Sequence, residues 1–136
     1  MSELIPLTFN KIMQSRAYTV IILGTESKKF AIYTEPQVGH MIQINLAQGK
    51  RPRPYTHDLL NSILKGLNAT LLQVVINNVE DTIYFARLFV EQQVDDQKQI
   101  LEVDARPSDC ITLALIHKIP LFCNSEVLEK AVAVPD

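Results

Sequence analysis

The stretch Tyr18-Thr19-Val20-Ile21-Ile22-Leu23, closed by Gly24, sets the fold class of this chain. It is apolar and rich in β-branched residues, which is typical of a strand within a sheet. Residues 5–9 before it and residues 28–34 after it alternate apolar with polar side chains, as half-buried strands do. Three strands in succession, with no helix between them, favour an antiparallel arrangement.

The second half of the chain repeats this pattern loosely. Residues 71–76 and 82–90 read as a hairpin joined by a loop over residues 77–81. A polar link over residues 91–99 then leads to a short strand at 100–104. Residues 121–123 form one more short strand. Strands that come in runs predict an α+β fold, a mostly antiparallel or mixed sheet with helices packed on it, in a single domain over residues 1–136.

Helical periodicity predicts the remaining elements. Apolar residues three and four apart indicate a helix over residues 38–46, with Gly49 just past its end. A second helix has Thr56 as its expected N-cap and an apolar stripe that reaches residue 67. Ser108 and Ser125 are the expected N-caps of two further helices. The third should be buried on several sides, because it has little polar surface.

Composition excludes several classes of protein. The 136 residues have 47% hydrophobic and 21% charged side chains, which is ordinary for a globular domain. A formal net charge of −2 and a pI near 5.9 argue against coating nucleic acid through charge. No apolar run approaches the roughly 20 residues that span a bilayer. We therefore expect no membrane association.

The cysteines and the first residues indicate the compartment. Cys110 and Cys123 lie in apolar surroundings without the spacing of a zinc site, so we expect two free thiols. Residues 1–4 lack the basic and apolar segments of a signal peptide. A cytoplasmic location is expected.

Chemistry is concentrated in two Arg-Pro motifs that each precede an expected helix. One is Arg53-Pro54-Tyr55-Thr56-His57-Asp58, and the other is Val103-Asp104-Ala105-Arg106-Pro107-Ser108-Asp109. If the two helix starts meet, they bring arginines, aspartates, hydroxyls and a histidine together. The expected catalytic residues are His57, Asp58, Asp104 and Asp109.

Each residue type in these motifs suits phosphodiester hydrolysis. Asp104 and Asp109, with Glu102 nearby, are candidate ligands for Mg²⁺ or Mn²⁺. Such a metal lowers the pKa of a bound water and neutralises charge that develops on phosphorus.

The same motifs also supply groups for binding phosphate and for moving protons. Arg53 and Arg106 can grip phosphate oxygens, and helix starts at Thr56 and Ser108 add backbone N–H donors. His57 titrates near neutral pH and can act as a general base or acid.

Structural explanations of these residues remain open. Aspartates in a first helical turn are stabilising without any catalytic role. Arg106 could pair with Asp58, and Arg53 with Asp109, as a lock between helices. Glu102 can lie on the wet face of a strand. His40 and His117 are interpreted as structural, and scattered glycines give no phosphate-binding loop.

The motifs taken together resemble the bifunctional nuclease family. The matching blocks are Arg53 to Leu60, Tyr84-Phe85-Ala86, Asp104 to Asp109, Ile119 to Phe122, and Gly39-His40. The resemblance implies a small α+β protein, a homo-oligomer, and cleavage of DNA and RNA. Two positions depart from the family pattern: Val38 stands where Glu often precedes the Gly-His pair, and Cys110 stands where Ala is usual.

Three hypotheses for function follow. The first is a metal-assisted nuclease that acts on transiently bound DNA and RNA. The second is a non-catalytic module that binds a nucleotide, another anion or a protein through the same arginine-lined helix starts. The third is a purely structural role for the motifs as an inter-helix lock.

Overall fold

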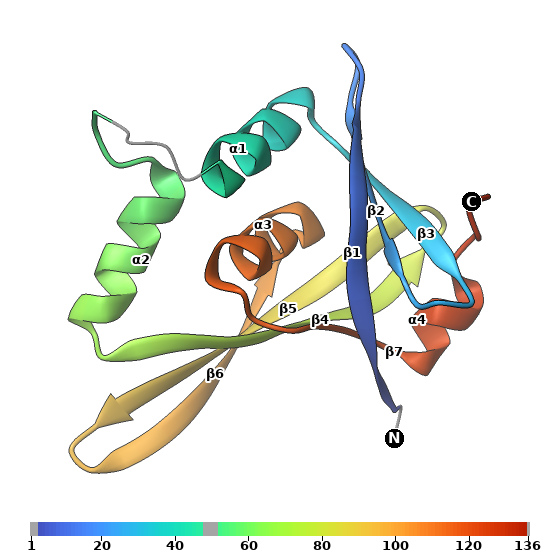
Figure 1. The fold of residues 1–136 in the computed structure, drawn as a ribbon. Helices are drawn as coiled ribbons and strands as arrows, with labels where there is room; N and C mark the ends of the chain where they lie inside the picture. Colours follow the sequence, from blue (N-terminus) through green and yellow to red (C-terminus); the bar gives the residue numbers. More distant parts are fainter. Residues whose placement is uncertain (1–2, 48–51, 136) are drawn as a thin grey trace.

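Two groups of strands form one curved sheet, as the computed structural model shows for residues 3–47 and 52–135 (Figure 1). The strands are β1 (Leu4–Gln14), β2 (Thr19–Gly24), β3 (Lys29–Thr34), β4 (Ala69–Glu80), β5 (Ile83–Val94), β6 (Gln97–Ala105) and β7 (Leu121–Asn124). The helices are α1 (Pro36–Leu46), α2 (Thr56–Gly66), α3 (Pro107–His117) and α4 (Ser125–Lys130).

The sheet order is β3-β2-β1-β7-β4-β5-β6. Every neighbouring pair is antiparallel except β4 and β7, which are parallel. The predicted α+β class with a mixed, mostly antiparallel sheet is therefore confirmed. Short β7 joins the two antiparallel groups, β1–β3 and β4–β6, and so holds the whole sheet together.

Helix α3 occupies the centre of the molecule. It contacts β3 from one group of strands, β4 and β5 from the other, and α1 (Figure 1). Its buried residues are Ser108, Cys110, Ile111, Thr112, Leu113 and Ala114, which confirms the expectation of burial on several sides. Ile21, Leu23, Phe30 and Ile32 complete the core from β2 and β3.

Two expected loops are in fact strand. Residues 77–80 continue β4, and the turn lies at Asp81 and Thr82. A register shift between Ile76 and Asn78 accommodates the polar Asn77 as a bulge. The polar residues 91–99, expected as a link, are the ends of β5 and β6 around a tight turn at Asp95 and Asp96.

That turn explains why the second loop was misjudged. Asp95 and Asp96 have φ of 51° and 64°, and Val94 pairs with Gln97 across them. Positive φ at both central residues is the geometry of a two-residue hairpin turn, which aspartate tolerates better than most residues. The sequence lacks the glycine that usually signals such a turn.

The expected N-caps are each wrong by one or two residues. Tyr55 is the N-cap in place of Thr56, Arg106 in place of Ser108, and Asn124 in place of Ser125. Proline fixes φ and lacks an N–H, so Pro107 suits the first helical position and leaves Arg106 as the cap. Gly49, the expected helix stop, lies outside the described residues.

Candidate functional site at the start of helix α3

Arg106 is the centre of a cluster of charges where β6 passes into α3. Its Nε and Nη2 atoms donate to the two carboxylate oxygens of Asp109, at 2.9 and 3.2 Å. Its Nη1 donates to Oε1 of Glu35 at 3.2 Å. These hydrogen bonds to Asp109, its negative charge and then Glu35 raise the pKa of Arg106 above its ordinary value. The guanidinium is thus held in one orientation while 58% of the side chain stays exposed.

The partner carboxylate comes from the start of α1. Glu35 is the N-cap of α1 and Pro36 follows it, just as Arg106 and Pro107 begin α3. The ion pair therefore joins two helix starts of the same construction. The sequence interpretation missed Glu35: its position before Pro36 marks a helix start but does not indicate that it pairs with Arg106.

A buried threonine fixes the start of α1 against β2. Thr19 is fully buried, and its Oγ1 accepts from the backbone N–H of Gly39 at 3.1 Å. The same hydroxyl lies 3.1 Å from the carbonyl of Pro36, to which it can donate. A Cβ on Gly39 would lie 2.7 Å from this oxygen, so the close approach requires glycine. Gly39 of the Gly-His pair thus has a structural explanation, and His40 is exposed beside it.

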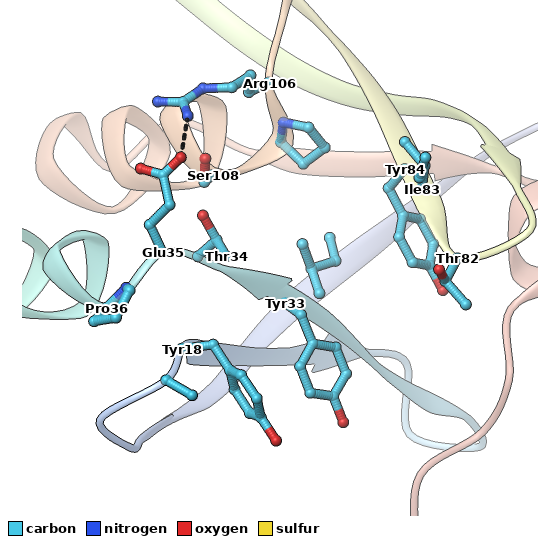
Figure 2. A pocket seen from close by; sticks show the side chains of 13 residues that line it. Tyr18, Tyr33, Thr34, Glu35, Pro36, Thr82, Ile83, Tyr84, Arg106 and Ser108 are labelled. Carbon is cyan, nitrogen blue, oxygen red and sulfur yellow. Dashed lines mark hydrogen bonds and ion pairs between the residues drawn. The ribbon is translucent and has the colours of Figure 1, made fainter.

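A cleft of about 550 Å³ opens beside the ion pair. It is lined by residues of β3, α1, β5 and α3, among them Thr34, Glu35, Tyr84, Arg106 and Ser108. Figure 2 shows Arg106, Glu35, Ser108 and Thr34 gathered on one side of this cleft, and Tyr84 at another. Ser108 is 4% exposed, and its hydroxyl hydrogen-bonds to no other residue that the structure describes. The cleft therefore offers a hydroxyl and a fixed guanidinium side by side.

Aromatic side chains bound the rest of the cleft. The Tyr84 ring stacks on Phe30 with centroids 5.3 Å apart. Burial, followed by the influence of Cys123, raises the pKa of Tyr84. Tyr18 and Tyr33 also line the cleft, with their rings in an edge contact at 5.2 Å. None of these aromatic residues was selected from the sequence as part of the site.

The two candidate metal ligands, Asp104 and Asp109, lie on either side of the junction between β6 and α3. Asp104 is exposed near the end of β6, and Asp109 lies in the first turn of α3. Burial, and then the charges of Asp109 and Asp104, raise the pKa of the Cys110 thiol to about 12. Cys110 is therefore a buried, inert thiol, like Cys123.

Within residues 3–47 and 52–135, no group of three or more His, Cys, Asp or Glu side chains forms a metal cage. The donors that do come together are the carboxylates of Glu35 and Asp109, which both accept hydrogen bonds from Arg106. Mg²⁺ commonly uses only one or two protein carboxylates and completes its shell with water and substrate phosphate. The residues present thus fit a cation that is shared with a phosphate ligand, and do not fit an all-protein site.

The other Arg-Pro motif lies elsewhere. Burial, then Lys65 and then His57 lower the pKa of His117, the last residue of α3. His57 therefore lies near the C-terminal end of α3, whereas Arg106 lies at its N-terminal end. Eleven helical residues separate these ends by roughly 16 Å. The two helix starts do not meet within one chain, so the condition under which the sequence grouped their residues is not fulfilled.

The remaining residues of this motif lie in α2 or in the segment just before it. Asp58 accepts from the backbone N–H of Tyr55 at 2.8 Å and so stabilises the helix start. Arg53 and Thr56 are exposed. The alternative pairing of Arg106 with Asp58, and of Arg53 with Asp109, is wrong, because Arg106 takes Asp109 and Glu35.

His57 and His117 share one further feature. Nδ1 of His57 and Nε2 of His117 are buried, and neither has a hydrogen-bond partner among the described residues.

Val38, where a glutamate is common in the resembled family, packs against the core from α1. The carboxylate at the start of this helix comes instead from Glu35.

No helix of the described chain is both long enough and apolar enough to cross a membrane.

Comparison with known proteins agrees with the motifs. The model of the bifunctional nuclease domain matches residues 20–135. Two uncharacterized proteins of Mycobacterium tuberculosis, Rv1829 of strain H37Rv and MT1877 of strain CDC 1551, are each 31% identical over 86 residues. The match covers 62% of this chain and 48% of each relative, so the chain spans about half of their length. With a family model that matches nearly its whole length, the chain belongs to the bifunctional nuclease domain family.

Proposed function

We propose that the protein hydrolyses phosphodiester bonds of DNA and RNA, with the scissile phosphate bound at the start of α3. One observation carries the proposal: the Arg106 guanidinium is fixed by two carboxylates at the edge of a cleft that Ser108 also lines, and no described residue hydrogen-bonds to the Ser108 hydroxyl. Membership of the bifunctional nuclease domain family supports the same reaction class.

Arg106 is the group that binds the phosphate. Guanidinium groups hold phosphate oxygens bidentately, and their positive charge offsets the negative charge that grows in the transition state. Asp109 and Glu35 orient the guanidinium before substrate arrives, so little rearrangement is needed on binding. Ser108 Oγ and the first backbone N–H groups of α3 add neutral donors on the same side of the cleft.

Carboxylates supply the other half of the chemistry. Asp109, with Asp104 or Glu35, would hold Mg²⁺ or Mn²⁺ together with the phosphate. When bound, this cation lowers the pKa of a water and neutralises charge on phosphorus. His57, with its neighbours Thr56 and Asp58 on α2, is not part of this proposed site within one chain, because His57 lies toward the far end of α3.

Cleavage of labelled single- and double-stranded DNA and RNA tests the proposal, in Mg²⁺, Mn²⁺ or EDTA. Arg106→Ala should lower kcat/KM by about 10²-fold or more, the loss expected for one preorganised charged donor. Lys98→Ala is the matched control. This substitution also removes one cation that is paired with a carboxylate, since Lys98 lies 3.7 Å from Glu91. Lys98 lies on β6, about 25 Å from Arg106 along the strand. Equal cleavage by both variants contradicts the proposed site.

A second candidate function rests on the same fixed guanidinium at the edge of the cleft, which suits any bound anion. The same cleft would then bind a nucleotide or another anion without turnover. This reading predicts saturable binding of inorganic phosphate or a nucleotide that is lost in Arg106→Ala, with no cleavage under any metal condition. Metal-dependent cleavage by the wild type, absent in Arg106→Ala, contradicts it.

A further inference from the structure

The outer face of the β1–β3 group presents large apolar side chains to solvent. Register places Met13 beside Val20 and Val20 beside Tyr33, on the face opposite to the core. Met13 is 51% exposed and Tyr33 is 64% exposed. Tyr18, two residues before Val20, is 44% exposed on the same face. The proposed hydrolysis uses none of these residues.

A second cleft, of about 470 Å³, lies on this face. Among the residues that the structure describes, its lining includes Lys11, Met13, Tyr18 and Tyr33 and no aspartate or glutamate. A lysine beside two exposed tyrosine rings is complementary to a polyanion that exposes flat rings.

Tyr18 and Tyr33 connect the two clefts. Their rings meet edge to face at an interplanar angle of 72°, so each limits the movement of the other. Both line the 550 Å³ cleft as well as the outer one. Figure 2 shows both rings directed away from Arg106, over the edge of β3 and toward the outer face. A ligand that lies on these rings can thus continue into the cleft with Arg106.

We infer that the outer face of β1–β3 is a binding platform for the bases of single-stranded nucleic acid. Unpaired bases stack on exposed aromatic rings whatever their sequence, while a lysine at the edge contacts the backbone phosphates. Bases in a duplex are already stacked and present only their edges, so the platform selects single strands. The inference rests on the proposed function for the identity of the ligand, and it names single-stranded DNA or RNA as the substrate class.

Binding can be measured without cleavage, by fluorescence anisotropy of a labelled dodecathymidylate in EDTA. The wild type should bind this strand at least about tenfold more tightly than a 12-base-pair duplex. Tyr33→Ala should weaken the binding about 5- to 150-fold, the range of one lost stacking contact. Tyr33→Phe should keep it, because the ring remains. Ile100→Ala is the control, since Ile100 is 54% exposed on β6 and lines neither cleft.

The inference and the proposed function fail separately. Single-strand binding that depends on Tyr33, in a protein that cleaves nothing, overturns the nuclease and leaves the platform standing. The opposite result overturns the platform alone: the protein cleaves, and Tyr33→Ala changes neither the KM for single-stranded substrates nor the affinity for dodecathymidylate. A third outcome also overturns the platform: Tyr33→Ala reduces the sedimentation coefficient, which shows that a second copy of the chain covers this face.

Discussion

At the scale of single residues, the contact between Gly39 and Thr19 fixes where α1 begins. A methyl group at position 39 would lie 2.0 Å from the side-chain oxygen of Gln14 and 2.7 Å from Thr19 Oγ1. Gln14 can move, but Thr19 is fully buried. Gly39→Ala should therefore lower the free energy of unfolding by about 1–3 kcal/mol, as overpacking does. Urea denaturation followed by circular dichroism measures the change.

Gly66 provides the matched control for this prediction. It is the last residue of α2, and a Cβ there would have no neighbour within 4 Å. Gly66→Ala should raise the free energy of unfolding by roughly 0.4–1 kcal/mol, because alanine restricts the unfolded chain. Equal effects of the two substitutions would contradict the role assigned to Gly39.

His117 should make stability depend on pH. Its pKa is lowered in the folded chain, so the unfolded chain binds more protons in acid. Its contribution is fully present above the unfolded pKa of about 6.5, and is lost as pH falls from there through the lowered folded pKa. His117→Gln should flatten the fall in unfolding free energy as the pH drops below about 6.5. His40→Gln, an exposed substitution on α1, should leave it as steep as in the wild type.

Residue types were easier to infer from the sequence than residue partners. Arg106, Ser108 and Asp109 were selected, and they lie together in or beside the cleft. Glu35, 71 positions before Arg106 in the chain, was missed, because no local pattern says which distant carboxylate an arginine will meet. The prediction of Ser108 as N-cap was wrong because a serine and a residue before proline both mark helix starts. Here Pro107 occupies the first helical position, so Arg106 is the N-cap.

At the scale of elements, the joined starts of α1 and α3 bear on the question of a structural lock. Both ion pairs of Arg106 are more than 40% exposed on each partner. Exposed pairs stabilise by only about 0.2–1 kcal/mol each. Arg106→Ala should thus lower the melting temperature by no more than a few degrees in differential scanning calorimetry. A loss of several kcal/mol would favour the lock over a binding site.

The strands were predicted correctly in kind but too short. Residues 91–94 and 97–99 extend β5 and β6 well past the apolar positions, as a two-stranded ribbon with polar side chains. Backbone pairing across the Asp95-Asp96 turn holds this ribbon, and pairing leaves little trace in hydrophobic periodicity. The buried strands β2 and β3, whose pattern is set by the core, were located to within a residue or two.

At the scale of the whole molecule, α2 is the element with the least support. None of its described side chains is buried. Even its large apolar residues are exposed: Leu59 is 57% exposed, Leu60 36% and Ile63 50%. The homo-oligomer expected from the sequence would cover this stripe. Ile63→Glu should then shift the species seen in sedimentation velocity toward the 15.4 kDa monomer, whereas Ser62→Glu, off the stripe, should not. A wild type that sediments as a monomer contradicts this expectation.

The measurement that tests the central claim most directly is cleavage of labelled single-stranded RNA and DNA in Mg²⁺. It compares the wild type with Arg106→Ala and Lys98→Ala, all three first shown to be folded. Metal-dependent cleavage that is kept in Lys98→Ala and reduced about 10²-fold or more in Arg106→Ala is the predicted result. Cleavage of equal rate in all three, or none from the folded wild type, would contradict a phosphodiesterase site at the start of α3.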